Sequence, residues 1–163
     1  MAAALSQPSQ WELETSSLLK SLHSRDPYDL YFAVIEVEET GRIDLLPRLI
    51  PLFHSRYIDV KTAAIRAVGA LGVTDAAFYT ATILPMLTDG SVSTRYEAAK
   101  ALARLAQLSA FDPLAELADE DPHPEVRRRA AQSARIIGGC PEAGDEVEET
   151  RVVSFNPFRL AGL

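Results

Sequence analysis

An internal repeat constrains the fold of this chain more than any other feature of the sequence. Four similar segments follow one another, and their third residues, Tyr31, Lys61, Arg95 and Arg127, are separated by steps of 30, 34 and 32 residues. The segments are DLYFAVIEVEETG from Asp29, DVKTAAIRAVGALG from Asp59, STRYEAAKALARLA from Ser93 and EVRRRAAQSARIIGG from Glu125. Self-similarity at a period of about 20–50 residues is typical of folds that stack one supersecondary unit many times.

Each repeated segment has the pattern of an α-helix. A small or polar residue is followed by an aliphatic residue or threonine, usually a cation, and then a pair of small or aliphatic residues. The pairs are Ala33-Val34, Ala63-Ala64, Ala98-Ala99 and Ala130-Ala131. Apolar residues recur three and four positions apart, which is helix periodicity rather than strand alternation. The small pairs predict that adjacent helices approach each other closely.

A second helix is predicted before each segment, at residues 11–23, 43–54, 76–89 and 110–120. Three of these stretches contain proline, at Pro47, Pro51, Pro85 and Pro113. An internal proline kinks a helix, so its recurrence indicates a bend that is part of the unit. Pro113 could instead stand at a helix start, where proline is tolerated. Turn-forming residues lie between the predicted helices, at Asp26-Pro27, Gly41, Gly72, Asp89-Gly90, Asp121-Pro122 and Gly138-Gly139.

The predicted fold is therefore all-α, an α-solenoid of about four antiparallel helix pairs over residues 11–139. Residues 1–10 are predicted to be a flexible N-terminus, and residues 140–163 a non-helical tail made of an acidic linker and an apolar segment. The chain of 163 residues is 47% hydrophobic, which suffices for the core of one domain.

The repeat resembles the HEAT-like repeat family, in the short form found in phycobilisome lyase subunits. The resemblance covers residues 11–139 and is strongest in DVKTAAIRAVGALG and PEVRRRAAQSARIIGG. The first unit departs from the pattern at Tyr31, where a cation is usual, and at Glu38, where an aliphatic residue is usual; the third has Thr94 for the usual valine. The family includes scaffolds, adaptors, chromophore-lyase subunits, a DNA-alkylation repair group and a metal-dependent hydroxylase group.

No catalytic arrangement of residues is recognisable in the sequence. The histidines His23, His54 and His123 lie in different units, and none forms a helical ligand pair or a His-Glu motif. Cys140 has no histidine close in sequence to activate it, and the glycines lie at hairpin ends rather than in a phosphate-binding loop. We therefore expect a chain that is not an enzyme and that needs no metal and no cofactor.

The resemblance implies that the second helices line a concave surface. Overlaying the four units places the following residues on it: Phe32, Glu36 and Glu39; Thr62 and Arg66; Tyr96, Lys100 and Arg104; and Arg128, Gln132 and Arg135. Mixed charge with aromatic residues and arginine favours a protein partner, although a solvated face without a ligand is the alternative. Lys61, Arg95 and Arg127 recur at one phase, which predicts a structural ladder with a neighbouring turn rather than binding.

The apolar segment of the tail carries Phe155, Phe158 and Leu160. Three interpretations remain open: it folds back onto the solenoid, it docks into a partner or a second copy of the chain, or it has no specific role. The second interpretation would make a homo-oligomer.

The favoured function is a protein-binding adaptor or scaffold, of which an inhibitor or immunity-type protein is a special case. The alternative is a subunit of a bilin lyase or of a related HEAT-repeat enzyme. Nucleic-acid binding rests only on Arg127, Arg128, Arg129 and Arg135, and the net charge of -7 opposes it. A lone cysteine, no signal peptide and no membrane-spanning apolar stretch lead us to expect a cytoplasmic protein with no membrane partner.

Overall fold

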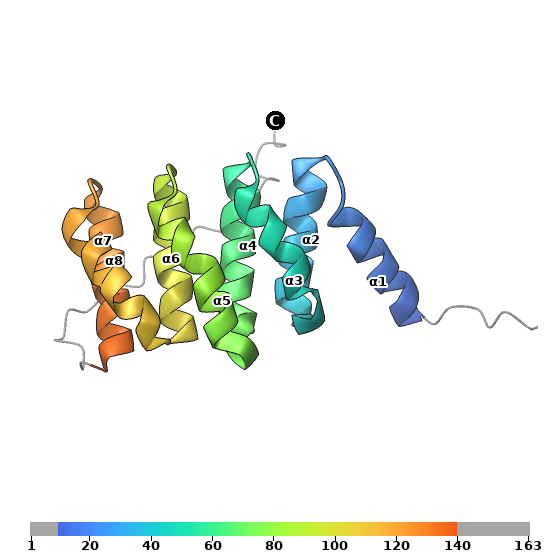
Figure 1. Ribbon diagram of the computed structural model, residues 1–163. Coiled ribbons are helices and arrows are strands. Elements are labelled where there is room, and N and C mark those ends of the chain that lie inside the picture. Colours follow the sequence, from blue (N-terminus) through green and yellow to red (C-terminus); the bar gives the residue numbers. More distant parts are fainter. Residues whose placement is uncertain (1–9, 140–163) are drawn as a thin grey trace, which may run out of the picture.

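The computed structural model describes residues 10–139, and all of their regular secondary structure is helical (Figure 1). The first helices of the four pairs are α1 (Gln10–Ser21), α3 (Leu46–Leu49), α5 (Ala76–Ile83) and α7 (Phe111–Glu120). The second helices are α2 (Pro27–Thr40), α4 (Ile58–Leu71), α6 (Val92–Leu105) and α8 (Pro124–Gly138). The pairs follow one another in a row from α1 to α8, so the predicted α-solenoid of four helix pairs is confirmed.

Short 3-10 helices extend or introduce the first helices, and prolines stand at several of these changes. They are η1 (Ile43–Leu45), η2 (Ile50–His54), η3 (Gly72–Asp75), η4 (Leu84–Thr88) and η5 (Leu108–Ala110). Pro51 and Pro85 lie in the first turn of η2 and η4, where the α-helical part of the unit has just ended. Because proline removes a backbone donor and clashes with the preceding turn, it ends α3 and α5 early. The bend predicted for the unit stays a prediction, although the change from α-helix to 3-10 helix at these prolines supports it; Pro113 lies in the first turn of α7.

The second helices are longer and have well-defined ends. Asp26 caps α2, because its Oδ1 accepts a hydrogen bond from the backbone N–H of Tyr28 at 2.8 Å. Gly41 and Gly139 end α2 and α8 with φ values of 65° and 68°, a left-handed conformation that glycine adopts freely. Ala106 takes the same role after α6 with φ 52°, although nothing in the sequence marks this alanine as a helix end.

The core lies between the two helix layers, where the first-helix layer contributes fully buried side chains such as Leu46, Phe53 and Leu114. The second helices also stack on one another, α2 on α4, α4 on α6 and α6 on α8. We call the position of Tyr31, Lys61, Arg95 and Arg127 the ladder position. The residue three positions later is fully buried in all four second helices: Val34, Ala64, Ala98 and Ala130. All members of the small pairs except Ala131 are buried. The pairs differ in phase by one residue, because the shared buried residue is the second member of the pair in α2 and α4 and the first member in α6 and α8. The first unit is nevertheless in phase with the others despite its departures at Tyr31 and Glu38.

Gly69 shows how closely the second helices approach. A Cβ placed on this glycine of α4 would lie 2.4 Å from the Cβ and 2.7 Å from the Cα of Ala101 in α6. Neither atom can move without shifting the α6 backbone, so only glycine fits at this crossing. The small residues in the repeat thus set the spacing between successive units.

One apolar run departs from the sequence expectation about membranes. Ile58–Thr88 is 31 residues long and, by length and composition alone, apolar enough to cross a membrane. The expectation that no such stretch exists is wrong by that criterion. The run consists of the four elements α4, η3, α5 and η4, and its large aliphatic residues Ile65 and Ile83 are fully buried in the core of the array. In its most apolar part 39% is buried inside the array, so helix packing accounts for part of its apolar character.

Candidate protein-binding face

The residues predicted to line the concave surface recur at matching positions of the second helices. We call their surface the second-helix face; its residues are Phe32, Glu36, Thr62, Arg66, Tyr96, Lys100, Arg128 and Arg135. Exposed among them are Phe32, Glu36, Arg128 and Arg135, and the other four are half-buried. Because α2, α4, α6 and α8 stack in order, the face runs from acidic at α2 to basic at α8.

The half-buried residues of α4 are engaged within the array. The Nε of Arg66 donates to the Oε2 of Glu38 in α2 at 3.0 Å. Burial lowers the pKa of Arg66, but this bond together with the charge attraction of Glu38, Tyr31 and Glu97 outweighs it, so the pKa is raised. The hydroxyl of Thr62 donates to the backbone carbonyls of Ile58 and Asp59 of its own helix. Glu38, an anomaly in the repeat pattern, is therefore the partner of Arg66, which links α2 to α4.

Tyr96 of α6 is fixed by an arginine of α8 that the sequence analysis did not place on this face. The guanidinium of Arg129 lies 4.9 Å from the centre of the Tyr96 ring, and its Nη2 donates to the tyrosine hydroxyl at 2.7 Å. The Nη1 of the same arginine donates to Gln132 at 2.9 Å. Such a cation–π contact combined with a hydrogen bond restrains the ring. Lys100 lies 3.8 Å from Glu97, one turn earlier on α6.

A groove crosses the second-helix face where α4, α6 and α8 begin. Its volume is 380 Å³, and its lining residues are Ile58, Asp59, Thr62, Val92, Ser93, Tyr96, Glu97 and Glu125. Asp59, Glu97 and Glu125 make it acidic, whereas Ile58, 48% exposed, and Tyr96 give it apolar and aromatic walls. The structure therefore brings together the predicted Thr62 and Tyr96. It adds three carboxylates and Ile58, which the overlay of the units did not single out. Ile58, Asp59 and Glu125 lie in the first turns of α4 and α8, whereas Glu97 lies in the second turn of α6.

A second groove lies in the first-helix layer and has a different character. It measures 340 Å³ and is lined by Leu84, Leu87, Thr88, Arg95, Pro113, Glu116, Leu117, Glu120 and Asp121. Arg95 and Asp121 are paired with each other at its base, so this groove belongs to the framework that joins η4 to α7.

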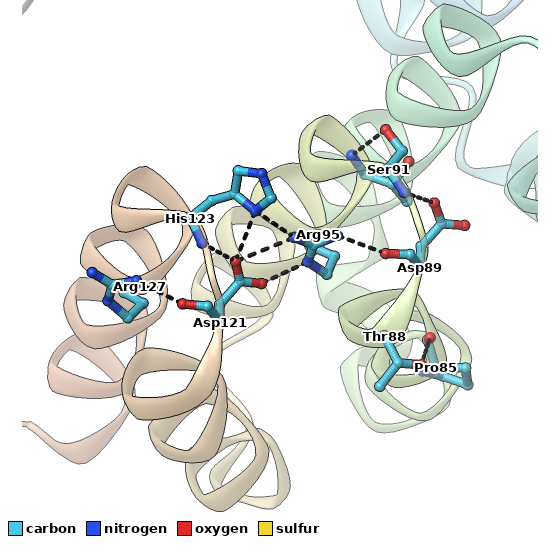
Figure 2. A network of polar contacts seen from close by, with 9 residues as sticks. Pro85, Thr88, Asp89, Ser91, Arg95, Asp121, His123 and Arg127 are labelled. Atoms are coloured by element: carbon cyan, nitrogen blue, oxygen red, sulfur yellow. Dashed lines mark hydrogen bonds and ion pairs between the residues drawn. The ribbon is translucent and has the colours of Figure 1, made fainter.

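The predicted ladder of cations is confirmed, and Figure 2 shows its central part. The Nζ of Lys61 donates to Asp89 in the turn of the next unit at 2.7 Å. The Nε of Arg95 donates likewise to Asp121, one unit further on, at 2.6 Å. In both cases a second helix is joined to the turn that precedes the following second helix. These cations are therefore structural.

The turn carboxylates of the ladder are stabilised in their charged form. The Asp121 carboxylate accepts hydrogen bonds from Arg95 and from the backbone N–H of His123. These bonds lower the pKa of Asp121 below its usual value, although burial acts to raise it. Burial by itself raises the pKa of Asp89. The hydrogen bonds from Lys61 and from the N–H of Ser91, together with the charge of Lys61, have the larger combined effect, so the pKa is lowered overall.

The histidines are spread along the array. The Nδ1 of His23 lies 2.7 Å from the carbonyl oxygen of Leu19, His54 is exposed at the end of η2, and His123 lies beside Asp121 at 3.5 Å. Within residues 10–139 no three histidine, cysteine or acidic residues are grouped so that they could hold a metal ion. The predicted tail residues Phe155, Phe158 and Leu160, together with Cys140, lie outside the described residues.

Comparison with known proteins supports the repeat architecture. The profile of the HEAT repeats family matches residues 80–154, which include α6, α7 and α8 and extend beyond Gly139. No curated protein matches the sequence significantly. A fold of this kind is that of a protein-interaction scaffold, and repeats of this kind commonly mediate contacts between proteins.

Proposed function

Because this chain is a HEAT-like repeat protein, we propose that it is a non-catalytic adaptor or scaffold that binds another protein in the cytoplasm through its second-helix face. One observation carries the proposal. Large apolar side chains are exposed on this face and in the groove that crosses it: Phe32 of α2 is 64% exposed, and Ile58 in the groove is 48% exposed. Exposed aromatic and aliphatic groups beside a groove are typical of the centre of a protein interface.

The rigidity of the face supports the same function. Tyr96 is restrained by Arg129, and Arg66 by Glu38, so the partner meets side chains that are already ordered. Binding then costs less conformational entropy, which leaves more of the contact energy as affinity. The carboxylates Asp59, Glu97 and Glu125 in the groove favour a partner that presents a cationic or amide side chain there.

The experiment compares two exposed phenylalanines, one in each layer. Phe32 belongs to α2 on the second-helix face, and Phe78, 51% exposed, belongs to the first helix α5. Tagged full-length protein, Phe32→Ser and Phe78→Ser are used for affinity capture from the native cells with quantitative mass spectrometry. We expect the unchanged protein and Phe78→Ser to recover the same specific partner in similar amounts. Phe32→Ser should recover about tenfold less of that partner, or less still, because loss of an interface aromatic costs about 2 kcal/mol or more of binding free energy.

Two results would contradict the proposal. Equal recovery with Phe32→Ser would remove the second-helix face from consideration. Loss of the partner with Phe78→Ser alone would move the interface to the first-helix layer.

A further inference from the structure

The outer face of α8 lacks the partner that the other second helices have. Lys61 and Arg95 each reach the carboxylate of a following turn. Arg95 and Arg127 also donate to the backbone carbonyl of the turn that precedes their own helix, Arg95 to Asp89 at 2.9 Å and Arg127 to Asp121 at 2.7 Å, but Arg127 has no carboxylate of a following turn among the described residues. No following unit exists among residues 10–139. The ladder therefore ends on a cation that has no carboxylate beyond it in the described part of the chain.

One packing position of α8 is more open than in the two helices before it. Ile65 of α4 and Ala99 of α6 are fully buried, whereas the equivalent Ala131 of α8 is half-buried, as is Ile35 of α2. The position of Gly69, which is pressed against α6, corresponds in α8 to the exposed Arg135. We call the surface made by Arg127, Arg128, Ala131 and Arg135 the α8 end face. It combines three cations with a small apolar centre. It shares Arg128 and Arg135 with the basic end of the second-helix face, so a segment that occupies it leaves Phe32, Ile58 and the groove to a partner.

The segment that follows α8 has the complementary charge. Its sequence PEAGDEVEET carries the carboxylates Glu142, Asp145, Glu146, Glu148 and Glu149. The single cation Arg151 follows, and then the apolar residues Val152 and Val153, so the segment remains acidic as a whole. The HEAT repeats profile continues to residue 154, which is the part of the sequence where a following unit would begin. Charge and repeat phase thus both indicate this segment as the occupant of the α8 end face.

The segment is also long enough. α8 has 15 residues and spans about 22 Å at 1.5 Å per residue. An extended chain covers about 3.3 Å per residue, so about seven residues suffice to run the length of α8. Gly139 turns the chain at the end of the helix through its left-handed conformation, so the segment need not continue along the helix axis.

We propose that residues 141–154 lie across the α8 end face, with their carboxylates against Arg127, Arg128 and Arg135 and with Val152 or Val153 over Ala131. The segment then closes the array in place of a further repeat. Terminal units of solenoids need such a polar outer covering, because an open stacking face invites association between molecules. The groove on the second-helix face is excluded as the site, since Asp59, Glu97 and Glu125 would repel an acidic segment.

Paramagnetic relaxation measured by NMR tests the proposal in the full-length chain. A nitroxide is attached to Val147→Cys in a Cys140→Ser background, and the amide signals of the ¹⁵N-labelled protein are recorded with the label oxidised and reduced. We expect the signals of Arg128, Ala131 and Arg135 to be lost in the oxidised state. Adding Arg128→Glu with Arg135→Glu should restore them, whereas Arg48→Glu, at an exposed arginine of α3, should not.

Each other outcome overturns the proposal. Broadening at the groove residues of α4 and α6, or at none of the described residues, would show that the segment does not lie on α8. A mixture of ¹⁵N-labelled unmodified protein and unlabelled nitroxide-bearing protein serves as the intermolecular control. Broadening of equal strength there would assign the occupant to a second copy of the chain. Broadening that persists in the double arginine variant would refute the role of the charges.

Discussion

The ladder pair between Arg95 and Asp121 provides the sharpest test of how the repeat units are held together. The side chain of Asp121 is 2% exposed and that of Arg95 10% exposed. The Asp121 carboxylate accepts from the Nε of Arg95 at 2.6 Å, from its Nη2 at 3.2 Å and from the N–H of His123 at 2.8 Å. Asp121→Ala therefore removes three hydrogen bonds and leaves a guanidinium buried without its carboxylate.

Breaking a buried ion pair by removing one partner costs about 3–5 kcal/mol, because the remaining charge is uncompensated. We expect Asp121→Ala to lower the free energy of unfolding by this amount. For a chain of this size each kcal/mol corresponds to about 2–4 °C, so the melting temperature should fall by about 6–20 °C. Urea denaturation followed by circular dichroism measures the change.

Two further variants show whether burial is the cause. Asp44→Ala removes a carboxylate that binds Arg42 at 2.7 Å but is 60% exposed, and it should cost less than about 1 kcal/mol. The double variant Arg95→Met with Asp121→Leu removes both charges and should recover most of the loss. If Asp121→Ala costs no more than Asp44→Ala, the ladder does not join the units as described.

Three other predictions follow from the packing, the titration and the helix cap. Gly69→Ala should destabilise the protein by about 1–3 kcal/mol in urea denaturation, because the added Cβ would lie 2.4 Å from the Cβ of Ala101. Alanine is the better helix former, so a gain in stability would contradict the close crossing of α4 and α6. The pKa values of Asp89 and Asp121 are lowered in the folded state. The stability that these carboxylates contribute is therefore complete above their unfolded pKa of about 4, and it is lost as the pH falls through their folded pKa values. The free energy of unfolding, measured during an acid titration, should fall below about pH 4, and the fall should be smaller in Asp121→Asn. Asp26→Ala should cost about 0.5–2 kcal/mol through loss of the cap on Tyr28, and a thermal melt that is unchanged would show that α2 does not depend on it.

Much of the fold could be predicted from the sequence because it depends on local periodicity. The second helices begin and end close to the predicted positions, since the small residues, the turn residues and the ladder cations recur together in each unit. Lys61 and Arg95 were predicted to pair with a neighbouring turn because they share a phase, and both do.

Features that depend on how one helix crosses the next could not be predicted in this way. Arg66 of α4 binds Glu38 of α2, which lies at a different phase of the repeat. The overlay of units likewise missed Arg129 over Tyr96 and the groove carboxylates Asp59 and Glu125. Ala106 ends α6 in a left-handed conformation without the glycine that marks the ends of α2 and α8.

Site-specific photo-crosslinking tests most directly whether the second-helix face is the working surface. The photoreactive residue p-benzoylphenylalanine replaces, in separate proteins, Phe32 or Ile58 on that face and Phe78 or Phe111 in the first-helix layer, all of them exposed. Irradiation in the native cells should join one and the same protein to the chain from positions 32 and 58 and leave positions 78 and 111 without that product. Crosslinks to one protein that form only from positions 78 and 111 would contradict the account.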